Sequence, residues 1–240
     1  MKFCGVGTEQ IERALHAIFP NIRSLRADGD TTRHKGSHEE LLHSFRSGKA
    51  DVLIGTQMIA KGLHFPQVTL VGVLNIDASL HIPDFRASER VFQLITQVAG
   101  RSGRSELPGE VILQTMLPDH PILRLAAEQN YEAFYAREID ERRLFNYPPF
   151  CHLIKVSCSG EDPQKTEAAA ESLHSQIQAV LPAGAELLPV IAAGYAKVKD
   201  QYRFQFLIKT PKISLFQPLL SSLAERSRCK VDIDPTSTFF

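Results

Sequence analysis

Short apolar runs alternate with helical patterns through the first half of the sequence, and this order constrains the fold more than any other feature. Residues 9–18 carry apolar positions at the spacing of a helix. The runs 51–56 and 68–74 are nearly all apolar, which is typical of strands buried on both faces. Strands that alternate with helices predict right-handed crossovers. We therefore expect an α/β domain whose parallel sheet is covered on both faces.

Local signals give the ends of several elements. Thr8 stands ahead of the first helix as an N-cap, and Ser37-x-x-Glu40 reads as a capping box that opens a second helix. Gly48 is expected to end that helix. Further elements are expected as a strand near 22–27, a helical turn over 57–61, a helix over 89–99 and a strand over 110–115.

The order of elements changes after Pro148. Residues 118–147 predict helix without strands, and the prolines at 148 and 149 end that segment. The remaining pattern is strand 152–158, helix 164–180, strand 186–193, strand 202–209, helix 213–226 and strand 230–234. This β-α-β-β-α-β order is that of a split-βαβ, ferredoxin-like domain. We expect an α/β domain over 1–117, a helical connector over 118–147 and a smaller α+β domain over 148–240.

Composition excludes several classes of protein. The 27 basic residues balance the 27 acidic ones, so any nucleic-acid surface must be local. No stretch of 18 apolar residues predicts a membrane span, and no apolar signal core follows the first residues. The four cysteines show no C-x-x-C pairing, which fits a reducing cytosol. No metal-ligand spacing is present among the nine histidines either, so we expect no metal site.

The segment from Gln97 to Arg104 carries the most specific chemistry. Arg101 and Arg104 lie three residues apart, and each directly follows a glycine. Glycine lets the backbone approach a ligand closely, and the guanidinium group offers a planar fork to phosphate oxygens. In phosphoryl transfer such arginines stabilise charge on the γ-phosphate. The alternative is a glycine-rich turn with two solvated arginines.

A second candidate loop follows the apolar run 51–56. Ligands bind at the carboxyl ends of strands in open α/β sheets. Thr56 can offer its hydroxyl and nearby amides to a phosphate, and Lys61 can add positive charge. An ordinary strand-to-helix loop is the alternative, although two such segments on one domain make coincidence less credible.

Together these segments resemble motifs V and VI of superfamily 2 helicases, and the first domain is similar to their second RecA-like lobe. The amino-acid sequence of these motifs resembles that of the replication restart, or primosomal, helicases of the PriA family most closely. The stretches that carry this resemblance are GVGTEQIE, RADGDTTRHKG, GTQMIAKGLHFPQVTLVGVLNID, PDFRASERVFQLITQVAGRSGR, PGEVILQT, ERR, PPF and VDIDP. They span nearly the whole chain, with the second domain matched more weakly.

The resemblance implies roles for individual residues. Arg101 and Arg104 would face ATP held by the first lobe, with Gln97 coupling the nucleotide to the lobe interface. Gly62 and His64 would lie near the nucleotide sugar. The residues expected to contact the backbone of single-stranded DNA are Thr8, Thr31, Thr32, Gly55, Thr56 and Lys61.

Two further charged groups have open interpretations. In the second domain Lys197, Lys199 and Arg203 are expected to contact DNA, and the aromatic residues at 202, 204 and 206 alternate with charged or polar ones. This alternation fits base stacking, but it fits an ordinary half-buried strand better. A charged set at Asp84, Arg86, Glu89 and Arg90 either supports the arginine loop, reaches DNA or forms an internal set of ion pairs.

The chain shows no G-x-x-x-x-G-K-[ST] motif and no Walker B aspartate. ATP and Mg²⁺ would therefore be bound mainly by a first lobe outside this chain, and we expect this chain alone to be inactive. The family also carries zinc, whose ligands are not in this chain.

The resemblance implies the C-terminal part of an ATP-dependent 3′–5′ DNA helicase that recognises stalled or repaired replication forks and initiates primosome assembly. Its partners would be forked and single-stranded DNA, single-stranded DNA-binding protein, other primosome proteins and the replicative helicase loader, in the bacterial cytoplasm near the nucleoid and without a membrane. The alternatives are a non-enzymatic fork-binding adaptor and half of an RNA helicase.

Overall fold

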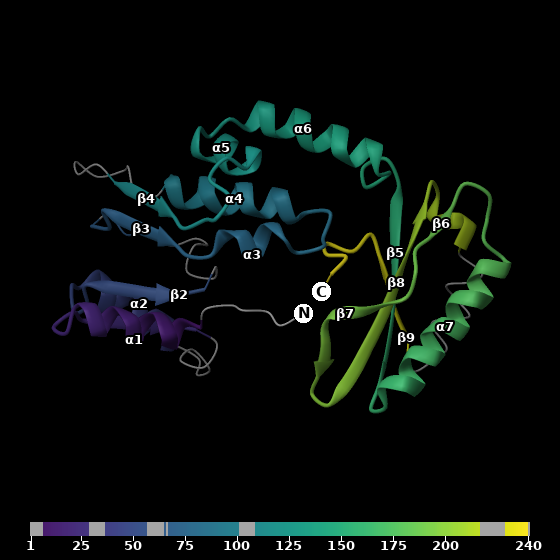
Figure 1. The fold of residues 1–240 in the computed structure, drawn as a ribbon, viewed down its shortest axis with the longest axis horizontal. Coiled ribbons are helices and arrows are strands. Elements are labelled where there is room, and N and C mark those ends of the chain that lie inside the picture. The colour runs from purple at the N-terminus through teal and green to yellow at the C-terminus, as the bar shows by residue number, and fades with distance from the viewer. Residues whose placement is uncertain are drawn as a thin grey trace. The chain divides into compact units, whose positions relative to one another are not determined.

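The computed structural model describes residues 7–28, 37–56, 65, 67–100, 109–216 and 229–239. The chain divides into two compact units. Unit 1 takes the stretches Met1–His81 and Ser88–Phe134, and unit 2 takes Ile82–Ala87 and Tyr135–Phe240. Figure 1 shows the elements of each unit. Among the described residues, no helix is long and apolar enough to cross a membrane.

Unit 1 begins with the helix α1 (Thr8–Ile18), which a β-α-β crossover follows. The crossover consists of β1 (Ser24–Ala27), α2 (Ser37–Arg46) and β2 (Val52–Gly55). The two strands are parallel, with Ala27 opposite Gly55. Gly48 has a φ of 73°, which lets the chain turn after α2 as expected. The prediction for Thr8 was wrong, because Gly7 occupies the N-cap position and the Thr8 side chain bonds elsewhere.

A second parallel pair follows in unit 1. The pair is formed by β3 (Leu70–Val73) and β4 (Glu110–Leu113). The helices α3 (Ile76–Leu80) and α4 (Ala87–Ala99) lie between them in the sequence. Leu70 lies opposite Glu110, and Val73 lies opposite Leu113. Among the described residues the two pairs are separate two-stranded sheets. The predicted alternation of strands and helices is confirmed, including the parallel pairing.

The core of unit 1 lies against one face of the β3–β4 pair. Val73 and Leu113 pack against a buried cluster drawn from α3, α4, the helix α5 (Pro121–Ala127) and the start of α6 (Tyr131–Leu144). On the other face Leu70 is 55% exposed and Ile112 is 52% exposed. Burial on both faces was therefore a wrong prediction for this pair, because an apolar run alone does not reveal which face a neighbour covers.

Unit 2 is built around an antiparallel sheet. Its elements are β5 (His152–Gly160), α7 (Pro163–Ala179), β6 (Glu186–Leu187), β7 (Ile191–Val198), β8 (Gln201–Thr210), a 3₁₀ helix (Ile213–Phe216) and β9 (Cys229–Ile233). The strand order is β6-β8-β5-β9, with β7 also paired to β8. This is the order expected of a split-βαβ domain. The predicted α+β fold is confirmed.

Two of the predicted elements of unit 2 differ in detail. The strand expected over 186–193 is divided into β6 and β7, with Pro189 between them. Proline has no amide hydrogen to give to a sheet, so it interrupts the pairing. The helix expected over 213–226 begins as the 3₁₀ helix, and its remainder lies outside the described residues.

The two faces of the unit 2 sheet have different partners. Helix α7 covers one face (Figure 1), where Ile154, Val156 and Phe206 pack against its Leu173 and Ile177. Side chains at the alternate positions of these strands, such as Lys155 and Gln205, point to the other face, where they donate hydrogen bonds to the carbonyls of residues 237 and 238. Both residues are buried although they are polar. The sheet of unit 2 is thus covered on both sides.

Candidate nucleic-acid interface

The carboxyl edge of the β1–β2 pair brings together three of the predicted DNA-contacting residues. Gly55 ends β2 opposite Ala27, and Thr56 directly follows it. Asp28 directly follows β1, and the hydroxyl of Thr8 donates a hydrogen bond of 2.7 Å to its carboxylate. Gly55 and Thr56 are exposed. Because ligands bind at the carboxyl ends of parallel strands, this edge is a candidate site.

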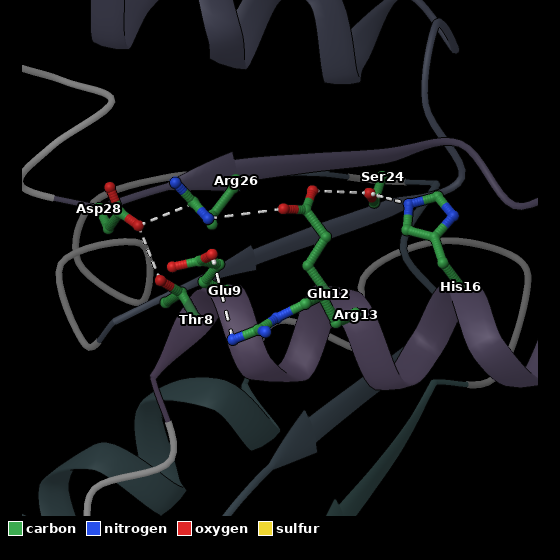
Figure 2. A network of polar contacts seen from close by, with 8 residues as sticks. All are labelled: Thr8, Glu9, Glu12, Arg13, His16, Ser24, Arg26 and Asp28. Carbon is green, nitrogen blue, oxygen red and sulfur yellow. Dashed lines mark hydrogen bonds and ion pairs between the residues drawn. The ribbon is translucent and has the colours of Figure 1, made fainter.

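A polar network joins α1 to β1 behind this edge (Figure 2). Its helical members recur every four residues and its strand members recur every two, so each set occupies one face of its element. They are Thr8, Glu12 and His16 on the helix, and Ser24, Arg26 and Asp28 on or directly after the strand. The helix therefore faces the strand with polar side chains, while Ile18 on its apolar stripe is 69% exposed.

Arg26 lies at the centre of the network. Its guanidinium is 2.9 Å from the carboxylate of Asp28 and 3.6 Å from that of Glu12. The three side chains retain 14–28% of their exposure, so solvent screens these ion pairs only in part. The pair with Glu12 therefore joins α1 to β1, whereas the pair with Asp28 lies along β1 and the residue that follows it.

The serine, histidine and carboxylate at the other end of the network do not form an acyl-transfer triad. The hydroxyl of Ser24 donates to Glu12 at 2.9 Å and lies 3.0 Å from Nε2 of His16. In a catalytic triad the carboxylate bonds to the second ring nitrogen of the histidine instead. The group therefore connects α1 to β1, and we assign it no nucleophilic role.

The bond to Asp28 limits what Thr8 can do. A hydroxyl has one hydrogen, and Thr8 donates its hydrogen to the carboxylate. A phosphate accepts hydrogen bonds, so a contact from this hydroxyl requires the bond to Asp28 to open. The negative charge of Asp28 also opposes a phosphate at this edge. The predicted role of Thr8 stays a prediction, and the structure adds this condition to it.

Sequence reasoning overlooked most of this network. Asp28 was noted only within the stretch RADGDTTRHKG, and Glu12, His16 and Arg26 were assigned no role. The signal was present in the sequence, because polar residues recur every fourth position over 8–16 and every second position over 24–28. Neither period says that the two elements face each other, which only the fold reveals.

Asp77 connects the carboxyl ends of the β3–β4 pair. It accepts hydrogen bonds from the hydroxyl of Thr115 and, at 2.7 Å, from the amide of Met116. The Met116 amide and then the Thr115 hydroxyl hold the pKa of Asp77 below its usual value. Asp77 is therefore ionised near neutral pH and anchors the end of β4 to α3.

The residues predicted to contact nucleotide are mostly not described. Gln97 lies half-buried near the end of α4, three residues before Gly100. The remaining predicted residues of this kind and the loop residues predicted to contact DNA lie outside the described residues; they are Thr31, Thr32, Lys61, Gly62, His64, Arg101 and Arg104. Among the described residues no group of three or more His, Cys, Asp or Glu could hold a metal ion.

The predicted basic residues of unit 2 gather at the β7–β8 hairpin. Lys199 and Asp200 form its two-residue turn, with φ values of 49° and 60°. Lys197 forms an ion pair of 2.9 Å with Asp200 and lies over the ring of Tyr202. Arg203 is half-buried on β8. The hairpin presents positive charge, although Asp200 neutralises part of it.

The aromatic alternation beside these lysines is that of a half-buried strand. Phe206 is 1% exposed in the core, and Phe204 packs against the same cluster. A base cannot stack on a ring that the core encloses. The interpretation favoured from the sequence is confirmed for these two rings. Tyr202 is half-buried beneath Lys197.

Comparison with protein families gives two matches, in chain order. The helicase conserved C-terminal domain matches residues 5–106. The primosomal protein N C-terminal domain matches residues 143–236. The first match includes α1 to α4 and the network of Figure 2, and the second contains most of the unit 2 sheet.

Relatives with known names match the chain over its length. Replication restart protein PriA of Chlamydia pneumoniae is 51% identical over 246 residues, which cover 100% of this chain and 33% of the relative. That of Bacillus subtilis is 45% identical over 97% of this chain and 29% of the relative. That of Haemophilus influenzae is 38% identical over 96% of this chain and 33% of the relative. The chain thus spans about a third of the length of these relatives and matches their C-terminal part.

Proposed function

The chain belongs to the PriA family of replication restart proteins, and we propose on that basis that it is the C-terminal part of an ATP-dependent 3′–5′ DNA helicase. The complete protein would recognise stalled or repaired replication forks and initiate primosome assembly. It would act in the bacterial cytoplasm, close to the nucleoid. The observation that carries this proposal is the succession of a helicase domain and a primosomal domain along one chain.

The proposed reaction is hydrolysis of ATP, held mainly by a first lobe outside this chain. Arg101 and Arg104 would approach the γ-phosphate, where two guanidinium groups stabilise charge that develops during transfer. Gln97 would couple this loop to the lobe interface, and Gly62 and His64 would lie near the sugar. Mg²⁺ would neutralise charge on the phosphates when it is bound. Zinc, if the complete protein carries it, would be held elsewhere.

The proposed path of single-stranded DNA runs over the carboxyl edge of the β1–β2 pair. Gly55 and Thr56 are exposed there, and Thr8 begins α1 beside Asp28. Amides and hydroxyls at such an edge contact phosphates without reading sequence, as a translocating motor requires. Thr31, Thr32 and Lys61 would extend this path. The hairpin with Lys197, Lys199 and Arg203 would add contacts to forked DNA.

Protein partners belong to the same proposal. A replication restart protein would act with single-stranded DNA-binding protein, other primosome proteins and the loader of the replicative helicase. The name carried by the relatives, replication restart protein PriA, supports a role in restart. Co-purification of the complete protein with single-stranded DNA-binding protein would test the first of these partners.

The decisive experiment is hydrolysis of ATP by the complete protein that carries this chain, with and without single-stranded DNA. Arg101→Ala should lower kcat about a thousandfold, the scale of an arginine that stabilises phosphoryl transfer. Arg23→Ala is the control, because Arg23 forms an exposed ion pair with Asp51 at the amino end of β2. It should leave kcat unchanged. Unwinding of substrates with a single 3′ or 5′ tail would establish direction.

Two results would replace this proposal with an alternative. If restart and unwinding persist in the double variant Arg101→Ala and Arg104→Ala, the fork-binding adaptor is the better description. If a forked RNA binds more tightly than the same forked DNA, the chain is half of an RNA helicase. We prefer the DNA enzyme because the relatives carry the name of replication restart proteins.

A further inference from the structure

Two cysteines of unit 2 face each other across its sheet. Cys158 lies on β5, and Cys229 is the first residue of β9, which runs along β5 (Figure 1). The two residues are directly opposite each other in the antiparallel pairing of these strands. Their sulfur atoms are 3.0 Å apart, although 71 positions of sequence separate the residues. Both thiols are free, and the pairing of the strands brings them into contact.

The geometry of this thiol pair suits a disulfide between neighbouring strands. Opposite residues of an antiparallel pair have Cα atoms about 4.5 or 5.5 Å apart. A disulfide accepts Cα separations of about 4.4–6.8 Å and joins the two sulfurs at about 2.0 Å. The sulfurs therefore need to approach by only about 1 Å from their separation of 3.0 Å. The backbone of the two strands can keep its register while the bond forms.

The two thiols differ in their access to solvent. Cys158 is 2% exposed and belongs to the core between the sheet and α7, together with Val156. Cys229 is half-buried and packs against the edge of the same core. A reagent in solution therefore reaches Cys229 first. Cys158 is reached through its neighbour.

The chemistry of Cys158 also depends on its neighbour. Burial, and then the hydrogen bond and the charge of Cys229, raise the pKa of Cys158 to about 12. Cys158 is thus a poor nucleophile towards reagents in solution, since the thiolate is the reactive form. A Cys229 sulfur bound in a mixed disulfide carries no charge and has no proton to share. Only burial then holds the pKa of Cys158 up, and the sulfur that it attacks is already in contact.

We propose that Cys158 and Cys229 form a reversible disulfide when the protein meets a small disulfide oxidant such as oxidised glutathione. The Cys229 thiol loses its proton to water and its sulfur attacks the oxidant, whose S–S bond breaks and whose first half leaves as a thiol after taking up a proton. Cys158 then loses its proton and attacks the Cys229 sulfur, which releases the second half as a thiol. Two electrons pass from the protein thiols to the oxidant, and a reducing thiol reverses both steps.

The disulfide would fix an edge strand at the end where it is least held. Among the described residues β9 pairs only with β5. Beyond the other end of β9, Asp234 accepts a hydrogen bond of 3.1 Å from the amide of Leu153. Lys155 and Gln205 then bind the carbonyls of residues 237 and 238. A link at Cys229 adds a covalent attachment at the start of the strand, so that β9 is held at both ends.

The thiol pair is therefore a redox-sensitive modification site in the unit that carries the primosomal match. Disulfides in a reducing cytosol are usually transient, and they form when the thiol–disulfide balance shifts towards oxidation. The reduced pair leaves β9 free to separate locally from the sheet, as edge strands do, and the oxidised pair forbids this opening. This inference does not rest on ATP hydrolysis or on DNA binding.

The test uses the complete protein without substitutions. It is incubated under native conditions with oxidised glutathione, and peptides are mapped by mass spectrometry without reductant. We expect a linked pair of peptides that contain Cys158 and Cys229, which dithiothreitol separates again. Hydrogen exchange of the β9 amides should be at least about tenfold slower in the oxidised protein than in the reduced one, because the link prevents local opening. Amides of β7, on another strand of the sheet, should exchange equally in both forms.

Three single variants separate the two steps. Cys158→Ala should trap Cys229 as a mixed disulfide with glutathione, because the second thiol is missing. Cys229→Ala should leave Cys158 unmodified, because no exposed neighbour passes the oxidant on. Cys151→Ala is the matched control: Cys151 is also buried, but it lies just before β5, at the other end from Cys158, and donates to the carbonyl of Asn146. This control should form the link as the wild type does.

Several results would overturn the proposal. It is wrong if the native protein gives no linked peptides, or if either cysteine of the pair links mainly to a different cysteine. It is equally wrong if Cys158 reacts in Cys229→Ala as fast as Cys229 reacts in Cys158→Ala, because the order of attack would then be lost. Unchanged exchange of the β9 amides in the linked protein would show that the disulfide does not fix the strand.

Discussion

The hydroxyl of Thr8 donates its hydrogen to Asp28 across 2.7 Å, and this bond ties the start of α1 to the carboxyl end of β1. The bond uses the hydrogen that a phosphate would need. It also places a carboxylate at the edge where we propose that DNA passes. The edge as it stands is therefore only partly adapted to a polyanion, and changes in Asp28 should alter DNA affinity in a predictable direction.

Replacing Asp28 by asparagine should strengthen binding of single-stranded DNA roughly twofold to threefold, because a unit charge a few ångströms from a phosphate costs about 1 kcal/mol in water and less when salt screens it. Arg26 would lose one of its two carboxylates and face the edge with more net positive charge. Fluorescence anisotropy with a labelled oligonucleotide measures the affinity in the complete protein.

Asp51→Asn is the matched control for that variant. It removes the same charge at the amino end of β2, where Asp51 pairs with Arg23. DNA affinity should not change in this control. Equal strengthening in both variants would mean that only net charge matters, and the proposed path over the carboxyl edge would be wrong.

The thiol of Cys158 should resist alkylation in the native protein at pH 8. Burial, and then the neighbouring sulfur of Cys229 at 3.0 Å, raise the pKa of Cys158 to about 12. The thiolate is the reactive form, so reaction with iodoacetamide should become appreciable only well above pH 9. Mass spectrometry of the labelled protein identifies the site, and labelling in denaturant shows that the residue is otherwise competent. Rapid native labelling at pH 8 would contradict the packing seen here.

The same thiol should make the protein less stable in alkali. The folded pKa of about 12 exceeds the ordinary value of 9.0, so the folded state keeps its proton where the unfolded state loses it. This contribution to stability is complete below pH 9 and is lost as the pH rises towards 12. The thermal midpoint of Cys158→Ser should therefore fall less steeply over this range than that of the wild type.

Much of the fold could be predicted from local patterns, because strand and helix periods and stop signals lie within a few residues of one another. The succession of strands in unit 2 and its helix α7 follow from such patterns, and so does the turn at Gly48, while most of the helix predicted over 213–226 lies outside the described residues. The division at Pro189 could have been predicted as well, since proline cannot donate to a sheet.

The network behind the carboxyl edge and the hydrogen bonds that hold Asp84 could not be predicted in this way. Arg26 meets Glu12 only because α1 folds back on β1, and Asp84 meets Ser237 across 153 residues of sequence. Sequence patterns indicate that a charged residue is present but not which distant group it faces. Asp84 accepts hydrogen bonds from the Ser237 hydroxyl and from the amides of Arg86 and Thr238, and the three interpretations of the charged set stay predictions.

Phe206 should prove to be a core residue and not a platform for bases. It is 1% exposed and packs with Ile154, Val156 and Ile208. Phe206→Ala should lower the free energy of unfolding by about 3–5 kcal/mol, the usual cost of removing a buried ring. Phe206→Leu should cost much less and leave DNA affinity intact, as measured by denaturant unfolding and by anisotropy. A loss of DNA affinity in the stable leucine variant would revive the stacking interpretation.

The β7–β8 hairpin offers the sharpest test of DNA contact by unit 2. Replacing both Lys197 and Lys199 by glutamine should weaken binding of forked DNA equally for all sequences, because phosphate contacts carry no sequence information. Each lost contact to a single strand should make the slope of log K against log salt shallower by about 0.7. Lys230→Gln is the control, since this exposed residue lies on β9 at the opposite edge of the sheet. An unchanged salt slope in the double variant, or an equal change in the control, would remove the hairpin from the DNA path and assign this side of unit 2 to protein partners.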